Sequence, residues 1–196
     1  MALDLYSNEN ADLSDLKSSP KLIRLDISSN LSLQAAMLSG LKTLEFLDLR
    51  KTGLKDCGAL SELVKSRELM LAQNELTQLS CLNQMAQLML LNVQANKIVS
   101  LADLEVHPNL VELVASANGI IDLTPLAKLI KLETLNLAGN NIANVQPLRD
   151  LQKLARFRIS ANPVATAEGK NKTSCPTDEG VSPEVRRFCQ PSGVPW

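Results

Sequence analysis

Apolar and polar positions follow one another along the chain with a constant period of 22 residues. Each unit has a polar anchor, with apolar residues five and three positions before it. The anchors are Asn8, Asn30, Thr52, Asn74, Asn96, Asn118, Asn140 and Asn162. Apolar residues at alternate positions lie on one face of a short strand, and a single unit cannot bury that face by itself. The pattern therefore predicts eight stacked coils whose strands pair in parallel.

Leucines continue at three-residue spacing after each anchor, which suits a 3₁₀ turn or a short irregular helix. Pro125 and Pro147 occupy equivalent positions of neighbouring units and argue against long regular helices there. We therefore expect a curved solenoid with a parallel β-sheet on its concave side. Short 3₁₀ or irregular turns are expected on its convex side.

The unit LxxLxLxxN is seen most clearly in residues 132–148, which read LETLNLAGNNIANVQPL. Repeated over about residues 3–164, it resembles the leucine-rich-repeat family, specifically the 22-residue subtype of internalins and of the repeat subunit that regulates type-1 protein phosphatase. The resemblance implies an α/β solenoid, a right-handed curved leucine-rich-repeat superhelix. We expect residues 1–164 to form about eight coils and residues 165–196 to form a C-terminal cap and tail.

The anchor asparagines are expected to form a structural ladder. Each lies where the chain turns inward, and its amide can both donate to and accept from backbone groups that the turn buries. Thr52 interrupts this ladder, because a hydroxyl offers one donor and no amide. Ser66 also occupies a position that holds leucine in the other units. We infer a local weakness between the third and fourth coils, numbered by their anchors.

The four cysteines fall into two kinds. Cys57 replaces leucine in a core position and is interpreted as a small buried hydrophobe, whereas Cys81 lies at a variable outer position and is a candidate free thiol. Cys175 and Cys189 follow the last unit, and this tail with the preceding Asn162–Val164 resembles the ends of some exported bacterial repeat proteins. The resemblance implies a Cys175–Cys189 disulfide and a periplasmic or secreted location, although sequence does not fix connectivity.

A capping element is expected over the open end of the last coil. Ser182 is a candidate N-cap residue and Pro183 suits the first position of a short helix. Val185, Phe188 and Cys189 follow at helical spacing and could face the terminal core.

Little in the sequence indicates catalysis. His107, the one histidine, lies in an outer-turn position that is mostly leucine elsewhere, so we interpret it as structural. Glycine-rich phosphate loops, HExxH and CxxC are absent, and we expect no enzyme activity, cofactor or metal. Charges nearly cancel, with 20 basic against 21 acidic residues, which gives no case for nucleic-acid binding. No apolar run approaches the roughly 18 residues of a membrane span.

The residues between the apolar strand positions are expected to point onto the concave sheet. Hydrophobic side chains form a predicted diagonal across the middle coils, and aspartates and arginines flank it. The predicted partner-binding residues are Asp26, Phe46, Asp48, Met70, Leu90, Asn92, Val114, Arg156 and Arg158. An apolar centre with charged flanks is typical of a protein-binding surface.

The sequence therefore predicts a protein-interaction module that binds another protein or a peptide. One alternative is a structural or assembly spacer that uses an exposed N-terminal edge around Leu3 and Leu5. Another is the binding domain of a larger exported protein, because no capping element precedes the first strand-like segment, which is compatible with a trimmed mature form or a fragment. A third interpretation is that the concave hydrophobes are unrelated single residues. Neither the partner nor the oligomeric state follows from the sequence.

Overall fold

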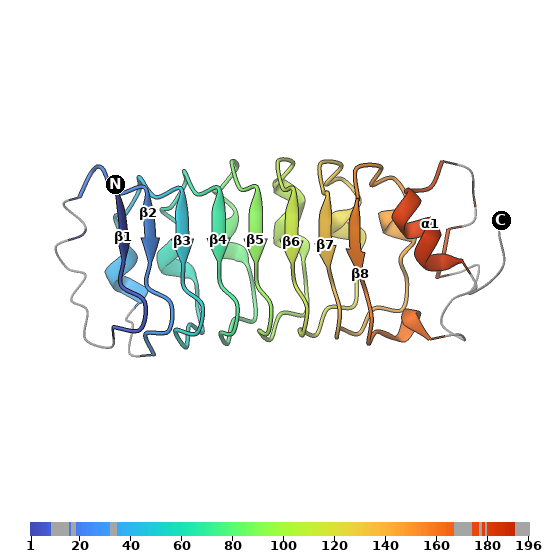
Figure 1. Cartoon of the computed structure of the whole chain (residues 1–196), viewed down its shortest axis with the longest axis horizontal. Coiled ribbons are helices and arrows are strands. Elements are labelled where there is room, and N and C mark those ends of the chain that lie inside the picture. The colour runs from blue at the N-terminus through green and yellow to red at the C-terminus, as the bar shows by residue number, and fades with distance from the viewer. Residues whose placement is uncertain are drawn as a thin grey trace.

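The computed structural model describes residues 1–8, 16, 19–31, 35–166, 174–176, 178 and 180–190. Within these residues eight short strands form one sheet, in sequence order and all parallel (Figure 1). The strands are β1 (Ala2–Asp4), β2 (Arg24–Asp26), β3 (Phe46–Asp48), β4 (Glu68–Met70), β5 (Leu90–Asn92), β6 (Glu112–Val114), β7 (Thr134–Asn136) and β8 (Arg156–Arg158). Every residue of β1 to β7 pairs with the residue 22 positions later, as Leu91 pairs with Leu113.

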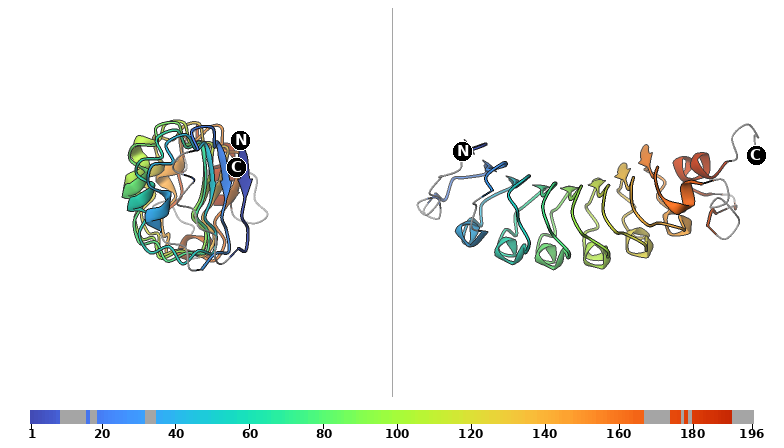
Figure 2. Two further views of the ribbon diagram at one scale, coloured as in Figure 1. Left: turned by 90° about the vertical axis from the view of Figure 1, so that its left-hand side faces the viewer. Right: turned by 90° about the horizontal axis from the view of Figure 1, so that it is seen from below.

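Strands β2 to β7 are each followed by a 3₁₀ helix on the opposite side of the coil. These helices include η2 (Ala35–Leu38), η3 (Gly58–Leu60), η4 (Ser80–Leu82), η5 (Ala102–Val106), η6 (Thr124–Leu126) and η7 (Gln146–Leu148). A further turn, η8 (Pro163–Ala165), follows the last anchor. The molecule bends so that the sheet lines its concave side and the 3₁₀ helices its convex side (Figure 2). The predicted solenoid is confirmed. None of the described helices is long and apolar enough to cross a membrane.

The core consists of the apolar columns that the period places on top of one another. The middle strand residues Leu47, Leu69, Leu91, Leu113 and Leu135 are completely buried. Burial of a side chain of this size stabilises the fold by about 1.5–3 kcal/mol, so the stack of leucines is its main source of stability. At Ser66, where other coils have leucine, a buried hydroxyl has no hydrogen-bond partner in the described part of the chain.

The anchor asparagines connect each coil to the one before it. Asn140 donates from Nδ2 to the carbonyl oxygens of Leu137 (2.8 Å) and Ala115 (3.0 Å), and its Oδ1 accepts from the Ile120 N–H (3.0 Å). Leu137 belongs to the coil of Asn140, whereas Ala115 and Ile120 belong to the preceding one. The same bonds recur at Asn74, Asn96, Asn118 and Asn162. The carbonyl and N–H groups at the turns are therefore satisfied although water cannot reach them.

Thr52 breaks the ladder at a different junction from the one predicted. Its hydroxyl bonds to the Leu49 carbonyl of its own coil (2.9 Å), and no bond reaches back to Ile27, where an asparagine would donate. Asn74, by contrast, bonds to Leu49 (2.8 Å) and Leu54 (2.9 Å) and joins the third and fourth coils normally. The part of the predicted weakness that rested on Thr52 is therefore misplaced, because an anchor contacts the coil before it, whereas the unsatisfied hydroxyl of Ser66 does lie between the third and fourth anchors. The missing bond lies between the second and third coils.

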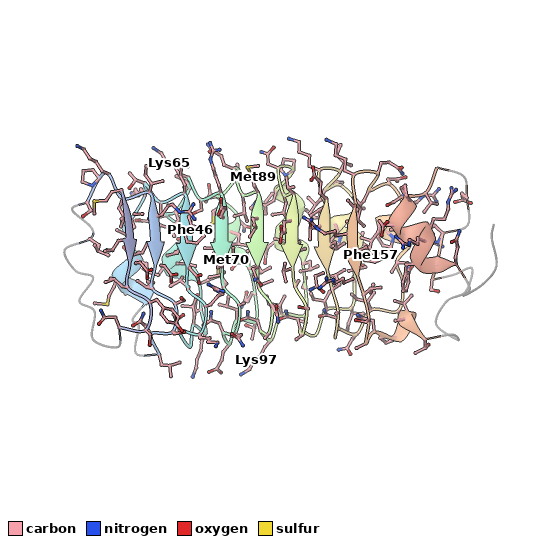
Figure 3. All side chains as sticks on the ribbon, in the orientation of Figure 1. Phe46, Lys65, Met70, Met89, Lys97 and Phe157 are labelled. Carbon is pink, nitrogen blue, oxygen red and sulfur yellow. A yellow bond between two sulfur atoms is a disulfide. The ribbon has the colours of Figure 1, made fainter. Side chains whose placement is uncertain are left out.

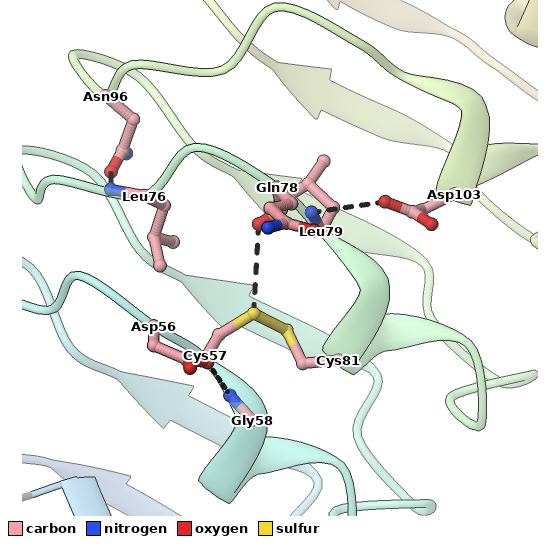
Figure 4. Close-up of a disulfide and its surroundings, with 9 residues drawn as sticks. All are labelled: Asp56, Cys57, Gly58, Leu76, Gln78, Leu79, Cys81, Asn96 and Asp103. Carbon is pink, nitrogen blue, oxygen red and sulfur yellow. Dashed lines mark hydrogen bonds between the residues drawn. A yellow bond between two sulfur atoms is a disulfide. The ribbon is translucent and has the colours of Figure 1, made fainter.

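A disulfide joins Cys57 to Cys81 across the third and fourth coils, with the two Cα atoms 5.6 Å apart (Figure 4). The prediction of a free thiol at Cys81 is therefore wrong, and Cys57 is buried as expected but is bonded. The two positions are 24 residues apart, one period plus two. This separation places them at neighbouring points on the convex turns of successive coils. A comparison of residues that are 22 positions apart does not reveal the pair, because the two cysteines do not occupy equivalent positions.

The last coil is covered by helix α1 (Pro183–Cys189). Val185 and Cys189 are buried, and the Phe188 ring packs edge-on against Phe157 of β8, with centroids 5.8 Å apart. The Cys175–Cys189 disulfide that the tail resemblance implied is present. Pro183 begins the helix, but the Ser182 side chain makes no capping hydrogen bond. Residues 191–196 of the predicted tail lie outside the described residues.

His107 is completely buried on the convex side. Its Nδ1 lies 3.2 Å from the Met85 carbonyl and donates to it, while Nε2 has no partner among the described residues. Burial lowers the pKa of His107 below its ordinary value of 6.5.

The folded protein therefore keeps His107 neutral at a pH where the unfolded chain protonates it. The contribution of His107 to stability falls as the pH drops below about 6.5 and levels off below the folded-state pKa. The variant His107→Leu places at this position the leucine that four other coils have. Between pH 7 and pH 5 we expect the free energy of unfolding to fall more for the native protein than for this variant. Urea unfolding of both proteins at the two pH values measures this. Equal losses would show that His107 does not titrate as its burial requires.

Candidate functional site

The concave face presents two columns of side chains, one from the first and one from the third residue of each strand. The strand-start column is Ala2, Arg24, Phe46, Glu68, Leu90, Glu112, Thr134 and Arg156. The strand-end column is Asp4, Asp26, Asp48, Met70, Asn92, Val114, Asn136 and Arg158. The middle residue of each strand points the other way, into the core.

The apolar residues of this face form a zigzag and not the predicted diagonal. Phe46 and Leu90 belong to the strand-start column with Glu68 between them, whereas Met70 and Val114 belong to the strand-end column. All four apolar side chains are half-buried. Phe46 and Met70 are labelled on the sheet in Figure 3. Polar residues therefore alternate with apolar ones along each column, and a partner would contact both kinds.

Phe46 is covered from above by a charged neighbour. The Arg24 guanidinium lies over the ring, with Cζ 3.9 Å from its centroid, and also approaches the Glu68 carboxylate at 3.9 Å. Stacking of this kind is worth about 0.5–1 kcal/mol at exposed sites. The apolar surface that remains open is therefore Met70, Leu90 and Val114.

Aspartate and asparagine recur in the strand-end column for a local structural reason. A side-chain oxygen accepts from the backbone N–H two residues later, where the strand has ended. The bonds run from Tyr6 to Asp4 (2.9 Å), Ser28 to Asp26 (2.9 Å), Arg50 to Asp48 (3.0 Å), Gln94 to Asn92 (3.1 Å) and Ala138 to Asn136 (3.2 Å). The predicted acidic flank is thus partly a set of turn-forming residues.

Of the three aspartates on that flank, Asp48 is not available to a partner. It is buried, and both of its carboxylate oxygens accept from Arg50 Nε, at 2.9 and 2.8 Å. The hydrogen bond to Asp48 raises the pKa of Arg50 above its ordinary value, so the guanidinium keeps its charge. Asp4 and Asp26 form no salt bridge with any residue in the described ranges, and Asp26 acts on Arg50 only at longer range.

The concave face is hollowed at its late end, over β6, β7 and β8. The hollow measures about 380 Å³. It is lined by Glu112, Val114, Thr134, Leu135, Asn136, Arg156, Phe157, Arg158 and Glu184. The structure thus brings three predicted residues together, namely Val114, Arg156 and Arg158. The other predicted residues, from Asp26 to Asn92, lie outside it on β2 to β5.

Sequence reasoning missed Glu184 and Phe157 of this hollow. Glu184 comes from α1, which folds back beside β8, so no periodic rule places it on the sheet. Phe157 occupies a core position in β8, the last strand of the sheet, so no following strand packs against its outer side. Phe157 therefore stays partly exposed next to Phe188.

Hydrogen-bond donors predominate at β7 and β8. Arg156 Nε donates to Thr134 Oγ1 (3.0 Å), whereas the side chain of Arg158 has no hydrogen bond or ion pair with any described residue. Asn136 pairs directly with Arg158 and uses its Oδ1 for the Ala138 N–H, which leaves its Nδ2 free to donate. Two adjacent donors facing the same hollow are suited to a carboxylate. Across the described chain, no three His, Cys, Asp or Glu side chains gather as a metal site would require.

Parallel strands stacked in register, one per 22-residue unit, with an open concave sheet are the architecture of a repeat solenoid. The family model described as "Leucine Rich repeats (2 copies)" matches residues 108–150. The crystal structure of internalin C2 from Listeria monocytogenes has 31% sequence identity and a TM-score of 0.79, over 82% of this chain and 71% of that one. The chain belongs to the leucine-rich-repeat family.

Two further structures share the fold. The functional domain of InlJ from Listeria monocytogenes, described as including a cysteine ladder, is 26% identical with a TM-score of 0.69, over 84% of this chain and 35% of that chain. The ectodomain of the receptor kinase GASSHO1/SCHENGEN3 from Arabidopsis thaliana, in complex with CASPARIAN STRIP INTEGRITY FACTOR 2, has 23% identity and the same TM-score, over 82% of this chain and 21% of that chain. The second likeness shows the fold alone. No curated protein matches the chain.

Proposed function

We propose that this chain binds a protein or peptide partner on its concave sheet. Leucine-rich-repeat proteins are generally protein–protein interaction modules and typically not enzymes. The observation that carries the proposal is the open apolar zigzag of Met70, Leu90 and Val114 in the middle of the sheet. Folding alone gives no reason for apolar side chains on a sheet face that is open to solvent. Half-buried hydrophobic residues within a polar rim are typical of binding surfaces.

The proposal extends to the compartment in which the protein works. Two disulfides, Cys57–Cys81 and Cys175–Cys189, suit an oxidising environment, which favours a periplasmic or secreted location. The chain spans 71% of internalin C2 and 35% of the InlJ domain. The binding role is therefore proposed for these coils, whatever larger protein contains them.

A double substitution on the sheet tests the concave site. Met70→Glu with Val114→Glu puts two carboxylates on the open apolar surface, where a partner would have to desolvate them. We expect at least a tenfold loss of captured partner, because burying an unpaired charge costs well over the ~1.4 kcal/mol that a factor of ten represents. Immobilised native and substituted proteins are compared by quantitative mass spectrometry of proteins captured from the source organism.

The matched control is Val99→Glu with Ile121→Glu. These side chains are 60% and 62% exposed and lie in the loops that follow β5 and β6, away from the sheet. The control introduces the same charges without touching the concave face, so its captured proteins should be those of the native chain. If both double variants lose the same proteins, or neither does, the concave sheet is not the site.

A further inference from the structure

We infer that the partner engages the sheet as an extended segment that crosses the strands and places an acidic side chain against Arg158 and Asn136. This inference rests on the proposed concave site and specifies the chemistry of what binds there. The charged side chains of the sheet that have no ion pair within the protein determine which charges a partner should carry.

At the late end, Arg156 and Arg158 have no ion pair with any described residue. Arg156 and Glu112 lie in the same column on either side of Thr134, and the Arg156 side chain is held by a hydrogen bond to the neutral Thr134 hydroxyl. Glu184, from α1, faces Arg187 at 3.6 Å. Arg158 remains in the hollow with no described counter-ion, beside the free Nδ2 of Asn136. A forked guanidinium with an adjacent amide donor is a suitable receptor for a carboxylate.

At the early end, two anions are left over. The Arg24 charge is shared with Glu68, and Arg50 is bound by Asp48. Asp4 and Asp26 keep one carboxylate oxygen each outside their turn hydrogen bonds, and neither forms a salt bridge with a described residue. Asp26 does lie close enough to Arg50 to contribute to its raised pKa, but the guanidinium is bound by Asp48. The strand-end column thus runs from negative at β1 and β2, through Met70 and Val114, to positive at β8.

The spacing of the strands sets the length of a segment that could use both ends. Six interstrand steps separate β2 from β8. At roughly 4.8 Å a step they span roughly 29 Å, which about nine residues of extended chain cover at roughly 3.3 Å each. The complementary segment therefore has a basic residue over Asp26, apolar residues over Met70 and Val114, and an acidic residue over Arg158. Charge complementarity also fixes its direction along the sheet.

Selection from a display library of random twelve-residue peptides tests this inference and needs no identified partner. The native protein should enrich peptides with Asp or Glu near one end and Lys or Arg about nine positions away. Arg158→Glu should lower the retention of the acidic peptides about tenfold and shift selection towards a basic residue at that end, because a charge-assisted pair becomes a like-charge contact. Lys153→Glu is the control, since it makes the same charge change in the same coil on an exposed residue outside the sheet.

The possible results separate this inference from the proposed function. The inference would be overturned if the selected peptides showed no acidic preference, or if Arg158→Glu left that preference unchanged. The proposed concave site would still stand in that case if Met70→Glu with Val114→Glu abolished binding of the selected peptides. Failure of the native protein to retain any peptide would overturn the extended-segment inference. The protein-capture comparison would then decide the concave site on its own.

Discussion

Replacement of Asn140 by alanine is expected to lower the free energy of unfolding by about 4 kcal/mol, a large effect for a single substitution. The amide makes three buried bonds, to the carbonyls of Leu137 and Ala115 and from the Ile120 N–H. Alanine provides no replacement partner, so the Ile120 N–H would stay buried without a hydrogen bond, at a cost of about 1–3 kcal/mol. The carbonyls of Leu137 and Ala115 would each lose one of two donors, because Asn162 (2.8 Å) and Asn118 (3.2 Å) also bond to them. Each of these two lost bonds costs about 0.5–1.5 kcal/mol.

Urea unfolding followed by circular dichroism measures the loss. The neighbouring Asn141 provides the control, because its side chain is exposed in the same turn. Asn141→Ala should change the unfolding free energy by less than about 0.5 kcal/mol. Similar costs for the two alanine variants would mean that the ladder bonds contribute little and that leucine packing alone holds the coils together.

Removal of the Cys175–Cys189 disulfide by Cys175→Ala with Cys189→Ala is expected to cost about 3 kcal/mol, the usual effect of opening a loop of this length. The bond closes a separation of 14 residues and holds α1 against the last coil. Without it, Phe157 and Ile159 of the last coil would lose part of their cover whenever the helix detaches. Urea unfolding without reductant gives the value, and mass spectrometry of the alkylated protein confirms the disulfide count.

The second disulfide supplies the comparison. Cys57→Ala with Cys81→Ala opens a bond in the third and fourth coils, far along the solenoid from α1. Because the two sites share no partners, their costs should add in the fourfold variant. An unfolding free energy of the Cys175→Ala, Cys189→Ala protein equal to that of the native chain would show that α1 covers the last coil without covalent help.

The coils and their order could be predicted from sequence because the signal is local and repeated. A leucine such as Leu91 has the same neighbours one period away on either side, so one rule describes most of the core. The asparagine ladder follows the same logic, since each amide bonds to backbone groups at fixed separations. Even the error at Thr52 concerned only the direction in which the bond runs.

The binding surface was less predictable because it depends on contacts between unlike neighbours. The strand alternation indicated which residues face the concave side, but it did not show that Arg24 covers Phe46 or that Asp48 is buried against Arg50. Nor does a repeat rule bring Glu184 to the hollow, since α1 lies outside the repeat. These features arise from side-chain conformation and from the return of the chain at its end.

The Cys57–Cys81 bond has a consequence for proteolysis. It closes a covalent ring that contains the whole of β4, including Met70. A protease that cuts once anywhere between these cysteines leaves the two fragments joined by the disulfide. Each fragment therefore stays at a high effective concentration relative to the other, which favours their continued association. For a protein exposed to extracellular proteases, the middle of the sheet would then survive a first cleavage with its apolar surface still attached to both ends.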